Sequence, residues 1–411
     1  MMQAKVQNIQ ANLDKLLCPE VHVLHRSWPS FQICGYTGLA CAILLSVSLV
    51  IHQGLSSWVM AGIILVAVLT FLAQAMLTKI VTGSEDLVYY RHEVAVLSMA
   101  ALFLWIVHQP VLPYIDATQL GVGIFLACGR VGCLMVGCCH GRPHRWGVCY
   151  GDEHARAGFA PYLVGVRLFP SQALESLWVL CIVVVGSLLV LTGHKPGTAL
   201  TWYVVTYDIG RFYSEFMRGD VERPYALGFS EAQWVSVLLL CIVVCAEVVG
   251  ILPFQWWHVL AAFVVICTMI VVSLRRRFQS VSMYRLLHPY HVKEIAGVLK
   301  RVSRDISASV QVERTSLGIQ LSYSYIKSET GEFYHYTLSH LSGNMREDAA
   351  RTIAKLIMQL THHEGSHKLL TPGPGIFHLL IEASQQDAGS RVSDSPHMKL
   401  ELEQQLSKAS V

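Results

Sequence analysis

Eight long apolar runs, separated by short polar segments, occupy the chain up to residue 274. A helix needs about 20 mostly apolar residues to cross the hydrocarbon core of a bilayer, and the runs are close to that length. The runs at 93–111 and 197–217 are more polar than the others, so we expect an all-α polytopic membrane region with seven or eight transmembrane helices. The predicted helices cover residues 31–53, 57–78, 93–111, 116–138, 172–193, 197–217, 232–252 and 255–274.

The pattern changes after residue 275, where the apolar residues become periodic. Residues 291–306 space their apolar side chains as an amphipathic helix does. Residues 344–363 predict a second helix, with Asn344 as its N-cap and acidic residues in its first turn. Four segments alternate as strands do, and "ETGE" between two of them is typical of a hairpin turn. The predicted strands are "VQVERT", "GIQLSYSYIKS", "FYHYTLSHL" and "GIFHLLIEA".

These patterns divide the chain into four parts. A polar N-terminal segment covers residues 1–30 and a membrane domain covers 31–275. A small soluble α+β domain follows at 276–383, and the polar tail at 384–411 is expected to be disordered.

Composition supports a membrane location for most of the chain. Of the 411 residues, 53% are hydrophobic and only 14% are charged, whereas soluble domains carry about 25% charged residues. The net charge of +3 gives no indication of nucleic-acid binding. The 12 cysteines lie mostly inside or beside apolar runs, where they serve as small fillers, and do not form the pattern of a secreted disulfide framework.

Lysine and arginine gather in alternate loops. They concentrate in 78–92, 139–171 and 218–231, and "SLRRRFQ" follows the last apolar run. Because cytoplasmic loops carry an excess of these residues, the pattern predicts that these loops and the C-terminal domain are cytoplasmic. With eight spans, both termini share that side.

The stretch "GRVGCLMVGCCHGRP", Gly129 to Pro143, places an arginine inside an apolar run. A charge at the bilayer centre costs about 2.5–3.5 kcal/mol, so Arg130 is a candidate functional residue that needs a partner. The glycines have no side chain, so another helix or a lipid headgroup can approach the backbone closely. The segment from Gly137 to Pro143 breaks the helix and exposes backbone N–H groups. Arginine together with free amides is suited to binding phosphate.

Two further stretches carry intramembrane charges. In "FPSQALES", Pro170 begins a helix that brings Glu175 into its first turns, which a helix cap alone would also explain. In "YDIGRFYSEFMRGD", four charged residues fall on one helix face and can pair, or can form a purely structural ladder. These are Asp208, Arg211, Glu215 and Arg218. Arg130 and Arg211 at one depth would form a site for an anionic lipid headgroup.

In this order and spacing, the three stretches resemble the motifs of the prolipoprotein diacylglyceryl transferase family, over residues 20–252. That resemblance implies a bacterial inner-membrane enzyme that transfers a diacylglyceryl group from phosphatidylglycerol to the cysteine thiol of a lipoprotein precursor. Its partners would be these two substrates and membrane lipids. It implies no metal and no other cofactor.

The resemblance also implies site residues. Arg130 and Arg211 match the family's two essential arginines, which are thought to hold the donor phosphate, and Glu175 matches an acid. Among the catalytic candidates it adds His92, on a weaker local match, and Glu215. The remaining substrate-binding candidates are Cys133, Gly137, Cys138, Gly141, Arg142, Arg218 and Gln233.

The sequence departs from the family pattern at two of these positions. Cys133 stands where the family has asparagine, and Cys138 where it has glutamate. The donor-binding arginines are kept, so two alternatives stay open: a different acceptor on the same lipid site, or loss of catalysis. A third alternative is a metal- or redox-sensing protein, although adjacent Cys138 and Cys139 lack the usual Cys-x-x-Cys spacing. Its site would be built on Cys133, Cys138, Cys139, His140 and Cys149. A transporter is a fourth, without an evident inverted repeat.

The implied reaction is nucleophilic substitution. The arginines stabilise glycerol phosphate as the leaving group while a thiolate attacks the glyceryl carbon. His92, His140 or a carboxylate takes the thiol proton. The resemblance implies that the site opens to the outer face, whereas the charge pattern predicts the cytoplasmic side.

Overall fold

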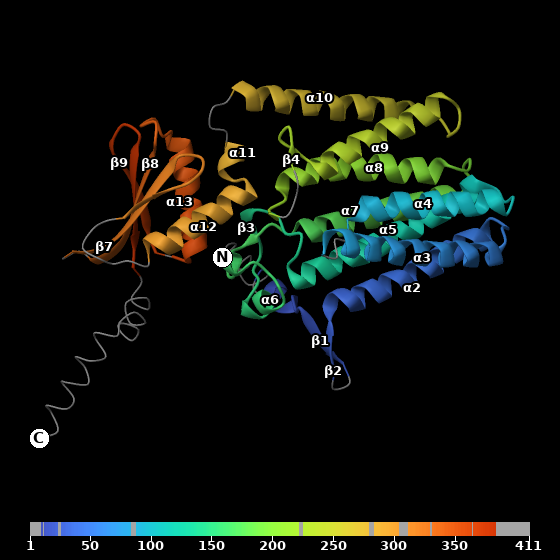
Figure 1. Ribbon diagram of the computed structural model, residues 1–411, viewed down its shortest axis with the longest axis horizontal. Helices are drawn as coiled ribbons and strands as arrows, with labels where there is room; N and C mark the ends of the chain where they lie inside the picture. The colour runs from blue at the N-terminus through green and yellow to red at the C-terminus, as the bar shows by residue number, and fades with distance from the viewer. Residues whose placement is uncertain are drawn as a thin grey trace, which may run out of the picture. The chain divides into compact units, whose positions relative to one another are not determined.

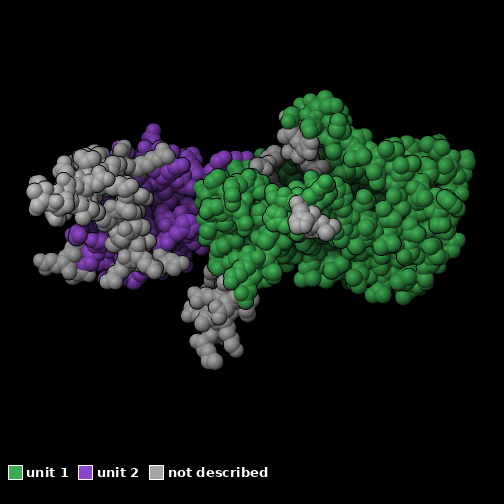
Figure 2. Space-filling model, turned by 90° about the horizontal axis from the view of Figure 1, so that it is seen from below, with its two compact units in different colours: residues 1–280 green, residues 281–411 purple. Residues whose placement is uncertain are grey.

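The computed structural model describes residues 10–383 with short gaps (Figure 1), and the chain forms two compact units, Met1–Ser280 and Val281–Val411 (Figure 2). The expected disorder of 384–411 therefore lies outside the described residues. The gaps are at 11, 24–25, 84–87, 222–224, 279–282, 304–310, 329–330 and 364.

Eight long helices build the described part of the first unit, and each of the eight predicted ranges falls on one of them (Figure 1). Six of them are long and apolar enough to cross a membrane, namely α2, α3, α5, α7, α9 and α10. The other two, α4 and α8, correspond to the two runs predicted to be more polar. The helices are α2 (Ser30–His52), α3 (Ser57–Thr82), α4 (Tyr89–Ile106), α5 (Val111–Val136), α7 (Ser171–Leu191), α8 (Thr198–Ser214), α9 (Glu231–Val248) and α10 (Trp256–Phe278).

Helix α5 is the central helix of this unit. Half of its most apolar window is buried, compared with 11% for α3, and it packs against α2, α4, α7 and α8. Glycines allow α2 to approach it closely, because a Cβ on Gly38 would lie 2.8 Å from the Cβ of Cys128, and one on Gly121 would lie 2.2 Å from Ser46 Oγ. Small residues at helix contacts are typical of membrane bundles.

Asp116 is a buried charge whose purpose the structure explains. Its carboxylate accepts hydrogen bonds of 2.7 Å from the backbone N–H groups of Gly197 and Leu200. These are unpaired donors at the N-terminus of α8, where negative charge is favoured. The N-cap residue of α8, Gly197, has no side chain to accept these hydrogen bonds, and Asp116 of α5 accepts them instead.

Short elements connect the helices at one end of the bundle. Between α5 and α7 lie β3 (Pro143–Val148), α6 (Asp152–Arg156) and η1 (Pro161–Leu163). After α8 come η2 (Glu215–Met217) and the hairpin of β4 (Tyr225–Ala226) and β5 (Phe229–Ser230). In the polar N-terminal segment, β1 (Glu20–Val23) pairs with β2 (Arg26–Pro29), a hairpin that the sequence pattern did not predict.

The second unit is an antiparallel five-stranded sheet with helices packed on one face. The strand order is β6-β7-β8-β10-β9. Alternate residues such as Leu321 of β7, Leu338 of β8 and Leu379 of β10 form the core with the apolar faces of α12 and α13. The elements are α11 (Met283–Leu286), α12 (Pro289–Val302), β6 (Val312–Arg314), β7 (Ile319–Ser328), β8 (Gly331–His340), α13 (Glu347–Thr361), β9 (His367–Gly373) and β10 (Ile376–Glu382).

Two predictions need correction here, and one strand was missed. The N-cap of α13 is Arg346 and not Asn344, because the helix begins at Glu347. Strand β9 was not predicted, since "HKLLTPG" lies at the sheet edge and alternates weakly. Helix α8 ends at Ser214, before the predicted end at 217, because the chain tightens into η2.

The core of the second unit generates a stability prediction. Leu338 of β8 is completely buried, whereas Leu341, just beyond the strand, is 62% exposed. Leu338→Ala should lower the unfolding free energy of this unit by about 2–5 kcal/mol through lost burial and a cavity. Leu341→Ala should change it by less than about 0.5 kcal/mol. Hydrogen–deuterium exchange of β8 in the full chain measures both, and equal effects would contradict the assigned core.

Candidate active site

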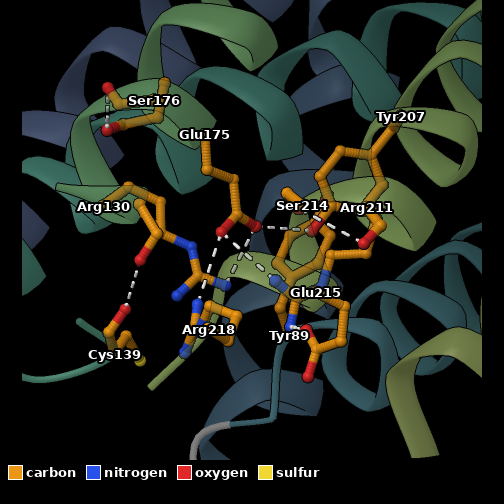
Figure 3. Close-up of polar contacts among 12 residues, drawn as sticks. Tyr89, Arg130, Cys139, Glu175, Ser176, Tyr207, Arg211, Ser214, Glu215 and Arg218 are labelled. Atoms are coloured by element: carbon orange, nitrogen blue, oxygen red, sulfur yellow. Dashed lines mark hydrogen bonds and ion pairs between the residues drawn. The ribbon is translucent and has the colours of Figure 1, made fainter. Parts of the chain in front are cut away.

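The carboxylate of Glu175, in the second turn of α7, is the centre of a buried ion cluster (Figure 3). Its oxygens lie 3.1 Å from Arg130 Nη2, 3.3 Å from Arg211 Nη1 and 3.6 Å from Arg218 Nη1. The Tyr207 hydroxyl donates a 3.0 Å hydrogen bond to the same carboxylate. Residues from α5, α7, α8 and the segment after η2 therefore meet at one acid.

Two further carboxylates complete the cluster. Arg211 Nη2 lies 3.0 Å from Glu215, one helical turn later. Arg218 contacts Asp220 with two parallel bonds, of 2.8 and 3.1 Å. Three guanidinium groups thus face three carboxylates, and each buried charge has an opposite partner. Such pairing is what allows ionised groups to be buried at all.

Asp208 does not join the cluster, although the helix-face pattern predicted that it could pair with Arg211. Among the described residues it forms no ion pair with Arg211, and its Oδ2 is buried without a hydrogen-bond partner. Arg218 also leaves the predicted helix face, because it is extended, with ψ of 143°, after η2. The chain turns there and brings Arg218 back towards Glu175.

The Pro-Ser-Gln stretch holds the turn that follows α5. Ser171 Oγ donates to the carbonyl of Cys139 at 2.9 Å, and Gln172 Nε2 donates to the carbonyl of Cys138 at 2.7 Å. Gly137 ends α5 with φ of 84°, a left-handed conformation that glycine adopts without steric cost. The start of α7 therefore fixes both Glu175 and the cysteine-containing turn.

Gly141 and Arg142 join three separate segments. Gly141 N donates to Phe169 O at 2.9 Å, and Arg142 N donates to Met217 O at 3.0 Å. The side chain of Arg142 adds a 3.2 Å hydrogen bond from Nε to the carbonyl of Arg218. The Gly-Arg ending of the first motif thus positions the backbone of the third motif.

A cavity of about 610 Å³ lies between α2, α3, α4 and α5. Apolar side chains form most of its wall, and Arg130 lines it as well. Arg211 and Arg218 are not among the lining residues; they lie behind the carboxylate of Glu175. Of the three arginines around Glu175, Arg130 is the one that a ligand in this cavity would contact, and its buried Nε has no hydrogen-bond partner among the described residues.

The cysteines of the first motif gather at the polar end of this cavity. Cys133, Cys138 and Cys139 all line it, and their sulfur atoms lie within 4.8 Å of one another. Cys133 is buried and Cys138 is exposed. The structure thus brings together the two positions at which the sequence departs from the family pattern.

The two candidate histidines have different surroundings. His92 of α4 lines the cavity, packs against Phe71 with ring centroids 4.5 Å apart, and has an Nδ1 without a hydrogen-bond partner in the described part of the chain. The Nδ1 of His140 lies 2.9 Å from Gly141 O, and burial lowers the pKa of this imidazole. His140 is not a lining residue of the cavity.

Gln233 does not reach the ion cluster. Its side chain accepts from Ser230 N, while its own backbone N–H donates to Ser230 Oγ, forming a capping box at the start of α9. Its Nε2 donates to Phe212 O at 3.1 Å. The residue therefore ties α9 to the end of α8.

Sequence reasoning missed a second polar network beside the cavity. Glu93 of α4 accepts hydrogen bonds from Gln119 Nε2 at 2.6 Å and from the Tyr89 hydroxyl at 3.0 Å, and Tyr89 contacts the hydroxyl of Tyr203 at 3.0 Å. Glu93 and Gln119 stand inside apolar runs, which was the available signal. Tyr207 and Asp220, both within the third motif, were also not singled out.

Together, the bundle of membrane-length helices and its buried arginine–carboxylate cluster define a polytopic membrane protein with an ionic site at one end. Residues 52–249 match the family model described as prolipoprotein diacylglyceryl transferase. This match confirms the family resemblance drawn from the three motifs.

Individual relatives show the same similarity. The chain is 32% identical over 133 residues to phosphatidylglycerol–prolipoprotein diacylglyceryl transferase 2 of Clostridium perfringens, covering 32% of this chain and 49% of that protein. It is 33% identical over 132 residues to a protein named phosphatidylglycerol–prolipoprotein diacylglyceryl transferase in Dehalococcoides mccartyi, covering 32% and 48%. The chain thus spans about half the length of these relatives.

The tight packing around Gly141 generates a prediction. A Cβ at this position would lie 2.5 Å from Phe169 O and 3.1 Å from Met217 O, both backbone atoms. Gly141→Ala should therefore destabilise the membrane unit by about 1–3 kcal/mol. In α5, Gly129 has no atom within 4 Å of its would-be Cβ, so Gly129→Ala should stabilise the helix by about 0.5–1 kcal/mol.

Thermal unfolding of the detergent-solubilised chain measures both variants. The midpoint should fall for Gly141→Ala and hold or rise for Gly129→Ala. A fall of equal size in the two variants would show that the Gly141 contacts do not hold the three segments together.

Proposed function

We propose that this protein transfers a diacylglyceryl group from phosphatidylglycerol to the thiol of a cysteine in a lipoprotein precursor. The observation that carries the proposal is the convergence of the three motifs on Glu175, with Arg130 presented to an apolar cavity. The family match over residues 52–249 and the names of the relatives support the same reaction.

The donor lipid would bind with its phosphate at Arg130 and its apolar part along the cavity wall. Arg130 shares the carboxylate of Glu175 with two other arginines and also lines the cavity. We therefore expect a phosphate to bind at the cavity side of Arg130 while Glu175 stays in place. Arg211 and Arg218 add positive potential from behind the carboxylate.

The chemical step forms one bond and breaks one. The acceptor thiol gives its proton to His92, and the thiolate sulfur attacks the glyceryl carbon attached to the phosphate oxygen. The carbon–oxygen bond breaks, its electron pair remains on that oxygen, and glycerol phosphate leaves. Arg130 stabilises the charge that develops on the leaving group. His92 is favoured over His140 because it lines the cavity and has an unbonded Nδ1.

The carboxylates act by positioning. Glu175 fixes the direction of Arg130, and Glu215 and Asp220 fix Arg211 and Arg218. Gly137, Gly141 and Arg142 shape the turn around this cluster. Cys133 and Cys138 lie where an acceptor thiol would approach, and Gln233 supports the site from the base of α9.

We also infer that all eight long helices span the bacterial inner membrane and that the second unit is cytoplasmic. Helices α4 and α8 pack among the six apolar ones, and buried charged groups on them have partners within the bundle: Glu93 with Gln119, and Arg211 with Glu215. Arg275, Arg276 and Arg277 at the end of α10 support a cytoplasmic position for the second unit.

The first test of function is a transfer assay with labelled phosphatidylglycerol and a peptide that carries a lipoprotein-precursor cysteine. Arg130→Ala should reduce transfer by about 10²–10³-fold, because a donor to the developing charge is lost. Arg130→Lys keeps the charge but not the planar fork, so it should recover only part of the rate.

Arg91→Ala is the matched control, since Arg91 forms an exposed ion pair with Glu231 at 2.7 Å. It should transfer at the wild-type rate. Unaltered transfer in Arg130→Ala would refute the proposed site. Release of glycerol phosphate without labelling of the peptide would instead point to a different acceptor.

The topology is tested with reporters at two positions. A green fluorescent protein fused after Arg277 should fluoresce, because it folds in the cytoplasm. Alkaline phosphatase inserted between α7 and α8, at Lys195, should be active outside it. Phosphatase activity after Arg277 would invert the proposed orientation and place the Glu175 end of the bundle at the outer face.

A further inference from the structure

The turn after α5 brings three thiols to one point, and no sulfur of the three takes part in the ion cluster or in the bond-making step of the proposed reaction. Cys133 comes from the last turn of α5, and Cys138 and Cys139 follow the left-handed Gly137. The three sulfur atoms all lie within 4.8 Å of one another. In the described part of the chain, this is the one group of three or more His, Cys, Asp or Glu side chains whose possible metal-binding atoms lie this close together.

The positions of the thiols are held by bonds outside the group. Cys139 is itself left-handed, with φ of 58°, a conformation that non-glycine residues adopt only when their surroundings hold them. Ser171 and Gln172 provide that support by binding the carbonyls of Cys139 and Cys138. The sulfur arrangement is therefore fixed by the start of α7.

We propose that Cys133, Cys138 and Cys139 form a binding site for one soft, thiophilic metal ion of the Zn²⁺ or Cu⁺ type. Metal–thiolate bonds of about 2.3 Å in a trigonal arrangement place the three sulfurs about 4 Å apart. Sulfurs within 4.8 Å of one another reach that arrangement by small side-chain rotations. Thiolate ligands select soft ions over Mg²⁺ or Ca²⁺.

Two neighbouring arginines favour the thiolate form at one of the three cysteines, Cys139. The guanidinium groups of Arg130 and Arg218 interact electrostatically with Cys139. Their positive charge compensates part of the charge of three thiolates. An ion can also reach the site, because Cys138 is exposed and all three cysteines line the cavity.

A disulfide between two of the three is the competing use of these thiols. It would leave the third sulfur without a role, whereas a metal engages all three. The proposal is independent of the transfer reaction, and its test uses binding alone.

The test uses the full chain in detergent, reduced with a phosphine, and Cd²⁺ alone as the probe. Wild-type protein should show a thiolate-to-metal charge-transfer band that saturates at one Cd²⁺ per chain. Each single replacement of a ligand should weaken Cd²⁺ binding by at least about tenfold, because losing a residue that only supports a metal ligand already lowers the affinity by that factor. The variants are Cys133→Ser, Cys138→Ser and Cys139→Ser. Cys149→Ser is the matched control, because Cys149 donates to Gly165 O and lies outside the group.

A second measurement keeps the test valid if the buried Cys133 variant does not fold. In wild-type protein, Cd²⁺ should protect the exposed Cys138 from alkylation and leave the reactivity of Cys149 unchanged. The proposal is overturned if no saturable band forms, or if the band persists in all three variants. Cysteines that pair as a disulfide and bind no Cd²⁺ after reduction overturn it as well.

Discussion

The membrane unit depends on the carboxylate of Glu175, which is the shared counter-ion of three arginines in an environment that cannot solvate them. Removing one partner from such a cluster leaves an unpaired charge, at a cost of about 3–5 kcal/mol. The constraint therefore fixes four segments relative to one another: the end of α5, the start of α7, the end of α8 and the turn at Arg218. The backbone hydrogen bonds of Gly141 and Arg142 also join the segment after α5 to the residues before α7 and to η2.

A balanced cluster also explains why the site can bind an anion and still be buried. If carboxylates occupied all donors of Arg130, a phosphate would have to displace one of them. The displaced carboxylate would then be buried without a partner, which costs free energy. If it were unpaired, the apo protein would bury a free charge. The observed cluster lies between these limits, because three carboxylates balance three arginines while Glu175 alone pairs with Arg130, which also lines the cavity.

The sequence predicted the features that depend on composition along the chain, and the rest depends on contacts in space. All eight helix ranges came from the length of the apolar runs, and Arg130 and Arg211 stood out because charges in such runs need partners. The pattern could not show that Glu175 serves both arginines, nor that Asp208 forms no ion pair with Arg211. Asp116 escaped notice for the same reason, since the helix that it caps begins more than eighty residues later.

The cysteines change the charge of the site in a way that bears on both proposals. Where the family pattern has glutamate, Cys138 is neutral as a thiol, so the polar end of the cavity carries one negative charge fewer. Less competition for the arginines favours a lipid phosphate at Arg130. Ionised thiols bound to a metal would restore negative charge at the same end, although the cation would offset much of it. The protonation and occupancy of Cys133, Cys138 and Cys139 therefore set the potential that an anionic headgroup meets at Arg130.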